Sequence, residues 1–137
     1  MEEPASASNF HLCLVADFRL VSAVLMNPDP CPLEVSVAET QRLLTDSSAK
    51  VVLIDVREPD EVTLCRIAGS RHIPMQTIPE QLDHLPRDRH LLIYCHHGGR
   101  SLRVTQFLRA RGFPTTSNVA GGIDAWAAEI EPEMRRY

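Results

Sequence analysis

The chain has 137 residues, 44% hydrophobic and 23% charged, which is typical of one globular domain and excludes a disordered or fibrous protein. Its net charge of -4 argues against a nucleic-acid partner bound through phosphate neutralisation. The longest apolar stretch, at 12–26, is interrupted by Asp17 and Arg19, so we expect no membrane-spanning segment and no membrane partner. The first four residues include two glutamates, unlike the basic start of a secretory signal, and we expect a cytoplasmic protein.

Residues 1–33 differ from the rest and are interpreted as an N-terminal extension to a domain over 34–137. Three prolines within 28–32 exclude regular secondary structure there. The domain's pattern begins only after them, so we expect residues 1–25 to be dispensable, with Met26 as an alternative native start. The rival interpretation is that Leu12 to Val15 forms an extra edge strand or covers an apolar patch of the domain.

Helical patterns and short apolar runs then alternate along the chain. The predicted elements, in order, are a helix at about 37–46, a strand at 51–54, a short helix that begins at a capping box over 77–80 and ends before Pro86, a strand at 91–94, a helix that follows residue 101 and ends before Gly112, a strand at 116–119 and a helix at 123–129. Short buried strands that alternate with helices predict an α/β fold, in which a small parallel sheet has helices on both faces.

The four cysteines, at positions 13, 31, 65 and 95, are too few and too unevenly spaced for a disulfide scaffold, and none forms the close pair of a structural zinc site. A reducing compartment is the simplest explanation. Cys65 follows a predicted loop, with neither a glycine turn nor a helix start after it, so we expect it to be a packing residue rather than a second catalytic thiol.

Cys95 stands out because it directly follows a predicted buried strand and precedes a helix, in the run Cys95-His96-His97-Gly98-Gly99-Arg100-Ser101. Sites in open α/β sheets form beyond the carboxyl ends of the strands. The two glycines let the backbone curl so that amide groups surround an anion, and the start of the following helix adds partial positive charge. Both effects favour the thiolate, which is a nucleophile.

The neighbours of Cys95 are given supporting roles. Consecutive side chains in a tight loop are expected to diverge, and the sequence has no further metal ligands at recognisable spacing, so we expect no metal or cofactor. His96 and His97 are instead predicted to stabilise an anion or to tune the thiolate. Arg100 is predicted to donate to a bound anion or to a backbone carbonyl that holds the loop. Asp55 ends a buried strand and is interpreted as a cap or an ion-pair partner, whereas Arg109 is explained by the helix dipole.

Over about 34–137 the chain resembles the rhodanese family of sulfurtransferases. The motifs that carry the resemblance are Asp55-Val56-Arg57-Glu58 with Ile67-Ala68-Gly69-Ser70 and Ile73-Pro74, the run from Cys95 to Ser101, and Val119-Ala120-Gly121-Gly122-Ile123-Asp124-Ala125-Trp126. The loop and the tail, which ends Arg135-Arg136-Tyr137, most resemble stand-alone bacterial rhodaneses and the domains fused to adenylating enzymes of molybdopterin synthesis. The chain departs from the family's pattern at Glu61-Val62 and Cys65-Arg66, which predicts a differently shaped loop there.

The resemblance implies a single rhodanese domain in which Cys95 accepts a sulfane sulfur as a persulfide and passes it to a nucleophile. The donor would be a small anion such as thiosulfate, and the acceptor a thiol, cyanide or a protein. The loop residues would bind the substrate, and Asp55 and Arg57 would orient the loops at the strand ends. No cofactor is implied.

Three alternatives remain open. Cysteine phosphatases and arsenate reductases of related fold resemble a pattern with five residues between cysteine and arginine, whereas here there are four, His96 to Gly99, and a smaller ring of amides suits a single sulfur atom. A non-catalytic binding module has no need of an intact Cys95. A sulfur carrier, loaded and unloaded by partner proteins in cofactor biosynthesis, shares all its chemistry with the enzyme.

Overall fold

The computed structural model describes residues 31–137, and the predictions made for residues 1–30 lie outside this range. The elements in chain order are β1 (Glu34–Val35), α2 (Val37–Thr45), β2 (Val51–Asp55), α3 (Pro59–Leu64), β3 (Arg71–His72), η1 (Met75–His84), β4 (His90–Tyr94), α4 (Gly99–Ala110), β5 (Thr116–Val119) and α5 (Gly122–Glu129). The strands form one five-stranded parallel sheet in the order β1-β5-β4-β2-β3, so the predicted fold class is confirmed.

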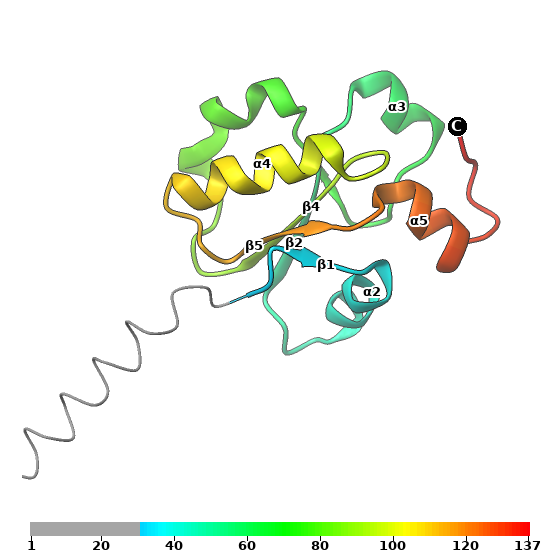
Figure 1. Ribbon diagram of the computed structural model, residues 1–137, viewed down its shortest axis with the longest axis horizontal. Helices are drawn as coiled ribbons and strands as arrows, with labels where there is room; N and C mark the ends of the chain where they lie inside the picture. Colours follow the sequence, from blue (N-terminus) through cyan, green and yellow to red (C-terminus); the bar gives the residue numbers. More distant parts are fainter. Residues whose placement is uncertain (1–30) are drawn as a thin grey trace, which may run out of the picture. The chain divides into compact units, whose positions relative to one another are not determined.

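Helices cover both faces of this sheet (Figure 1). Successive side chains of a strand point to opposite faces, so β4 sends Leu91 and Ile93 to one side and Leu92 and Tyr94 to the other. On the first side they pack with side chains of α4 and η1, and on the second with side chains of α2 and α5. The central strand β4 is therefore buried on both faces, as its continuous apolar run predicts.

The segment after β3 differs from its prediction. It is a 3₁₀ helix over Met75–His84 rather than a helix capped at Thr77, and Pro79 lies inside it. The Thr77 hydroxyl donates to the carbonyl of Pro74, 2.9 Å away, so it caps no helix start. Pro79 has no backbone N–H to donate, which favours short 3₁₀ turns over a continuous α-helix.

Three elements were not predicted, and their size explains why. The strands β1 and β3 have two residues each, which is too short for a hydrophobic pattern. Helix α3 has six residues, none of them buried, so it shows no apolar periodicity. Its first turn does hold a signal, because Pro59 at the first helical position follows Glu58, which forms a reciprocal capping box with Glu61.

Residues 31–33, just before β1, are hydrogen-bonded to β5 and to α4. The Ser117 hydroxyl donates to the carbonyl of Pro32 (2.6 Å), and the backbone N–H of Asn118 donates to that of Leu33 (2.7 Å). Arg109 donates to the carbonyls of Cys31 (3.0 Å) and Thr116 (2.8 Å). The helix dipole alone is thus an insufficient explanation for Arg109, which joins α4 to β5 and to this segment. Over residues 31–137, every helix is too short or too polar to cross a bilayer.

Candidate active site

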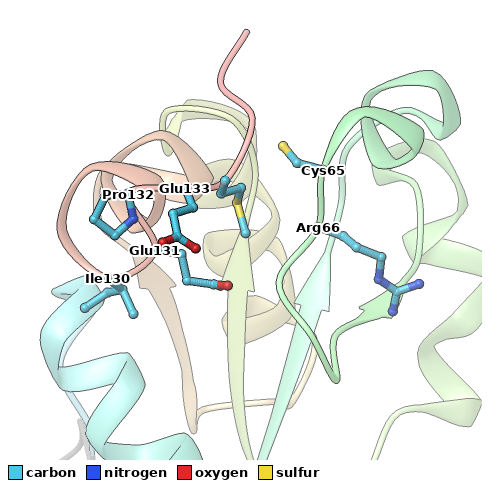
Figure 2. A pocket seen from close by; sticks show the side chains of 7 residues that line it. Cys65, Arg66, Ile130, Glu131, Pro132 and Glu133 are labelled. Atoms are coloured by element: carbon cyan, nitrogen blue, oxygen red, sulfur yellow. The ribbon is translucent and has the colours of Figure 1, made fainter.

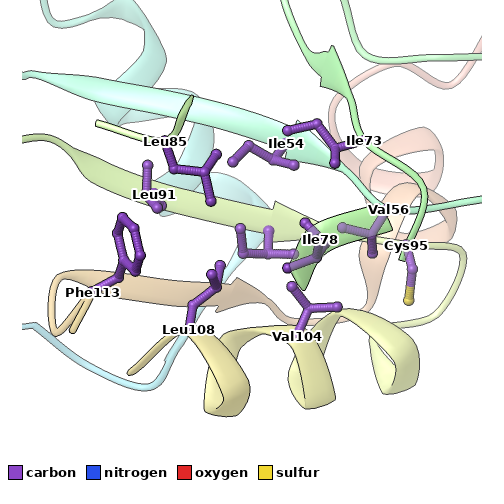
Figure 3. Close-up of a cluster of buried hydrophobic side chains, with 11 residues drawn as sticks. Ile54, Val56, Ile73, Ile78, Leu85, Leu91, Cys95, Val104, Leu108 and Phe113 are labelled. Atoms are coloured by element: carbon purple, nitrogen blue, oxygen red, sulfur yellow. The ribbon is translucent and has the colours of Figure 1, made fainter. Parts of the chain in front are cut away.

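Cys95 follows the last residue of the central strand and lies at one end of a cluster of buried side chains (Figure 3). Only 1% of its surface is exposed. The start of α5 holds the backbone here: the N–H of Ile123 donates to the carbonyl of Cys95 (2.9 Å), and the N–H of Asp124 donates to that of His96 (3.0 Å). The cysteine is therefore fixed from both sides, by β4 and by α5.

Three donors point at the Cys95 sulfur. They are the backbone N–H of Gly98 at 3.1 Å, the backbone N–H of Ser101 at 3.4 Å and the hydroxyl of Ser101 at 3.3 Å. Burial alone would raise the pKa of the Cys95 thiol, but these hydrogen bonds and the positive charge of Arg100 together lower it below its usual value. The local environment of Cys95 therefore favours the thiolate, which agrees with the prediction that backbone amides of the loop after the strand stabilise it.

The two glycines of the loop have different roles. Gly98 has a φ of +109°, which disfavours any other residue, and a Cβ on it would lie 3.3 Å from the backbone nitrogen of Gly121. Gly99 begins α4, has no positive φ, and a Cβ there would have no neighbour within 4 Å. The prediction that both glycines shape the loop therefore holds only for Gly98.

Arg100, predicted to donate to a bound anion or to a backbone carbonyl, instead binds a carboxylate of the protein itself. Its two terminal nitrogens donate to the two carboxylate oxygens of Glu61 at 2.8 and 2.9 Å, a bidentate ion pair that joins the loop to α3. Arg100 is the main cause that lowers the pKa of Glu61 to about 2, and the same pair raises the pKa of Arg100. Glu61 was noticed only as a departure from a family pattern, and its role in the site was missed.

Asp55 and Arg57 form a buried ion pair beneath the site. The guanidinium of Arg57, which is 0% exposed, donates to both carboxylate oxygens of Asp55 at 2.9 and 2.7 Å. It also donates to the carbonyl of Cys65 at 2.7 Å and to that of Glu61 at 3.3 Å. A buried charge needs such pairing, and here it connects the end of β2 to the middle of α3 and to the residue just after it.

His96 and His97 do not diverge as predicted. Their ring centroids lie 3.9 Å apart with a 32° angle between the planes. His97 is exposed and its Nε2 lies 3.8 Å from a carboxylate oxygen of Asp124, whereas burial and the neighbouring His97 lower the pKa of His96. The two side chains therefore lie on the same side of the loop, where the ring of Tyr137 also stacks on His96.

The chain after α5 returns to the site and covers His96. The ring of Tyr137 stacks on His96 with centroids 3.9 Å apart and planes 11° apart. The Tyr137 hydroxyl accepts a hydrogen bond from Arg57 (2.8 Å) and donates to Glu61 (3.0 Å), while burial raises its pKa to about 12. In the sequence, Tyr137 stands out only as part of the tail, and no local pattern connects it to a loop about forty residues earlier.

Cys65 lies beside this returning segment. It ends helix α3, so residues 62–64 are helical rather than the predicted loop. With Arg66 it lines one side of a hollow of about 560 Å³, and Glu131, Pro132 and Glu133 line the other (Figure 2). The thiol is half-buried and, unlike Cys95, has no N–H donors pointing at it among the hydrogen bonds of the described residues.

The chain is a parallel α/β domain with a buried thiol between a central strand and a helix start, where two backbone amides and one hydroxyl donate to the sulfur. The model of the rhodanese-like domain family matches residues 36–129, and the chain belongs to this family.

Two curated relatives and one solved structure illustrate the similarity. Over 94 residues, 67% of this chain, it is 39% identical to the "probable adenylyltransferase/sulfurtransferase MoeZ" of Mycobacterium tuberculosis, of which it spans only 24%. Over 100 residues, 73% of this chain, it is 37% identical to the "putative sulfurtransferase YtwF" of Bacillus subtilis and spans 95% of that protein. The human single-domain sulfurtransferase TSTD1 superposes with a TM-score of 0.65 at 28% identity, covering 72% of this chain and 98% of that one. The chain is thus a rhodanese-like domain whose relatives include sulfurtransferases.

Proposed function

We propose that this protein transfers a sulfane sulfur from a small anionic donor such as thiosulfate, or from another persulfide, to a thiol, cyanide or protein acceptor. The observation that carries the proposal is the set of three donors on the Cys95 sulfur, which favour a nucleophilic thiolate. The sulfurtransferase names of its relatives support the same chemistry. The residues from His96 to Ser101 bind the substrate in this proposal, and Asp55 and Arg57 orient the loops at the strand ends. The buried ion pair of Asp55 and Arg57, with its hydrogen bonds to the carbonyls of Glu61 and Cys65, supports the second role.

The reaction proceeds in two half-reactions. The Cys95 thiolate attacks the outer sulfur of thiosulfate, a new S–S bond forms, and the S–S bond of thiosulfate breaks so that sulfite leaves with the electron pair. The loop amides that now face the thiolate then face the persulfide anion and stabilise its charge. An acceptor such as cyanide attacks the outer sulfur, thiocyanate leaves, and the electron pair of the broken S–S bond returns to Cys95.

The loop geometry supports sulfur transfer over phosphate chemistry. A phosphatase of this kind needs its loop arginine to clamp the oxygens of a phosphate group. Here the arginine after the loop, Arg100, is held by Glu61 through both terminal nitrogens and serves to fix the loop. The amides of Gly98 and Ser101 converge on one sulfur atom.

The decisive experiment is intact mass measurement after incubation with thiosulfate. We expect the mass to rise by one sulfur atom, to return to its original value after cyanide or a thiol is added, and to stay unchanged in Cys95→Ser. The matched control, Cys65→Ser, should gain the sulfur as the wild type does. If the wild type hydrolyses aryl phosphates efficiently and never gains a sulfur, the proposal is wrong and a phosphatase takes its place.

A second candidate is a sulfur carrier that serves partner proteins in cofactor biosynthesis, and the pairing of adenylyltransferase with sulfurtransferase in the name of one relative supports a partner of this kind. It uses the same Cys95 persulfide, so the two candidates differ in their partners rather than in their chemistry. Steady-state turnover of thiosulfate with cyanide tests this. An enzyme for small molecules turns over many times, whereas a carrier is loaded once and releases its sulfur efficiently only to a protein acceptor.

A further inference from the structure

We propose that His96, His97 and Asp124 form a binding site for a divalent transition-metal ion of the zinc type at the rim of the Cys95 loop. Each residue offers one ligand atom, and the three atoms lie within 4.8 Å of one another. Two imidazoles and one carboxylate are a donor set that suits zinc and its neighbours. Metal binding here is independent of the sulfur chemistry proposed above.

A buried ring nitrogen is the second observation. The Nε2 atom of His96 is buried and has no hydrogen-bond partner among the described residues. Buried polar atoms without a partner are rare in folded proteins, and a bound ion is a recognised explanation. The ring that carries it stacks on Tyr137 and lies against the ring of His97.

The carboxylate of Asp124 is already oriented for a ligand. Arg136 donates to its Oδ1 atom from Nε at 3.1 Å and lies 3.0 Å away through Nη2, while Oδ2 lies toward His97 at 3.8 Å. Metal-binding side chains are commonly held in this way by a second set of residues. In addition, the backbone N–H of Asp124 is bonded to the carbonyl of His96, which keeps the helix start and the loop together.

The distances need only a small adjustment. In a tetrahedral zinc site with bonds of about 2.0–2.1 Å, ligand atoms lie about 3.4 Å apart. The present group has to contract by roughly an ångström, and rotation of the His97 side chain, which is 68% exposed, can supply this. Because His97 faces solvent, a water molecule can complete the coordination, and the bound ion would link the Cys95 loop to α5.

Cobalt(II) is the probe for this site, because its absorption spectrum distinguishes nitrogen and oxygen ligands from thiolates. Titration of the full chain should show one bound ion, displaced by Zn²⁺, without a thiolate-to-metal charge-transfer band. We expect His97→Gln and Asp124→Asn each to weaken binding at least tenfold. The same substitution at an exposed histidine outside the group, His84→Gln, should leave the affinity unchanged, and so should Cys95→Ser.

Because Asp124→Asn can also loosen α5, the exposed His97→Gln is the variant that decides. Zinc should also shift the NMR signals of the His96 and His97 rings in the wild type but not those of His84. The proposal is overturned if cobalt does not bind, if a strong thiolate band appears, or if His97→Gln binds with the affinity of the wild type.

Discussion

Removing the Ser101 hydroxyl should raise the pKa of the Cys95 thiol by about one unit. The hydroxyl lies 3.3 Å from the sulfur and is one of the three donors. A hydrogen bond to a charged group contributes about 1.5–3 kcal/mol, and a sulfur acceptor at this distance takes the lower end of that range. Since one pKa unit corresponds to about 1.36 kcal/mol, Ser101→Ala should leave about tenfold less thiolate at neutral pH.

The assay is the rate of alkylation of Cys95 by iodoacetamide as a function of pH, followed on the Cys95 peptide by mass spectrometry so that the other cysteines do not interfere. The midpoint of the profile gives the thiol pKa. Thr105→Val is the matched control, because this buried hydroxyl lies one turn further along α4 and donates to the carbonyl of Ser101 (2.8 Å) rather than to the sulfur.

The expected result is a profile displaced to higher pH in Ser101→Ala and unchanged in Thr105→Val. The variant should also lose about tenfold in sulfur transfer at neutral pH, and recover most of that loss when the pH is raised. An unchanged midpoint in Ser101→Ala would show that the hydroxyl contributes nothing to the stability of the thiolate. An equal displacement in both variants would attribute the effect to the helix rather than to the donor.

Three further perturbations test the surroundings of the loop. Gly122→Ala should lower the free energy of unfolding in urea by more than about 2 kcal/mol, because φ at this position is +59° and the new Cβ would lie 2.5 Å from the carbonyl oxygens of Cys95 and His96. The control Gly99→Ala should change that free energy by less than about 1 kcal/mol, because a Cβ there has no neighbour within 4 Å. Equal effects of the two substitutions would contradict this prediction. Glu61→Gln should cost about 1.5–3 kcal/mol at pH 7. Because the folded-state pKa of Glu61 is lowered from 4.5 to about 2, its contribution is present above pH 4.5 and is lost as the pH falls through about 2, so the unfolding curves of the two proteins should converge in that range. Cys65→Ser should retain sulfur transfer within a few-fold, and a large loss with the fold intact would instead identify Cys65 as a relay thiol.

The central part of the fold could be predicted because its signals are local. The strands β2 and β4 are continuous apolar runs, and Cys95 with Gly98 and a helix start is readable within seven residues. Strands of two residues, such as β1 and β3, exist only through their pairing with β5 and β2 and leave no pattern of their own.

The contacts that complete the site come from distant segments, which explains why they were missed. Glu61 reaches Arg100 from a helix thirty-nine residues earlier, and Tyr137 reaches Arg57 over eighty residues. Side chains at such separations meet only once the sheet has brought their elements to one edge. The contact between the His96 and His97 rings is likewise a property of the folded loop, which residue types alone do not reveal.

The chain's single tryptophan lies in α5, three residues before the helix ends. The indole N–H of Trp126 donates to the carboxylate of Glu131 at 2.5 Å, and six residues after Glu131 the same segment stacks Tyr137 on His96. A displacement of this segment from the domain would break the indole hydrogen bond and change the polarity around the ring. Trp126 emission is therefore a dye-free signal with which stopped flow can test whether the tail leaves His96 during sulfur transfer.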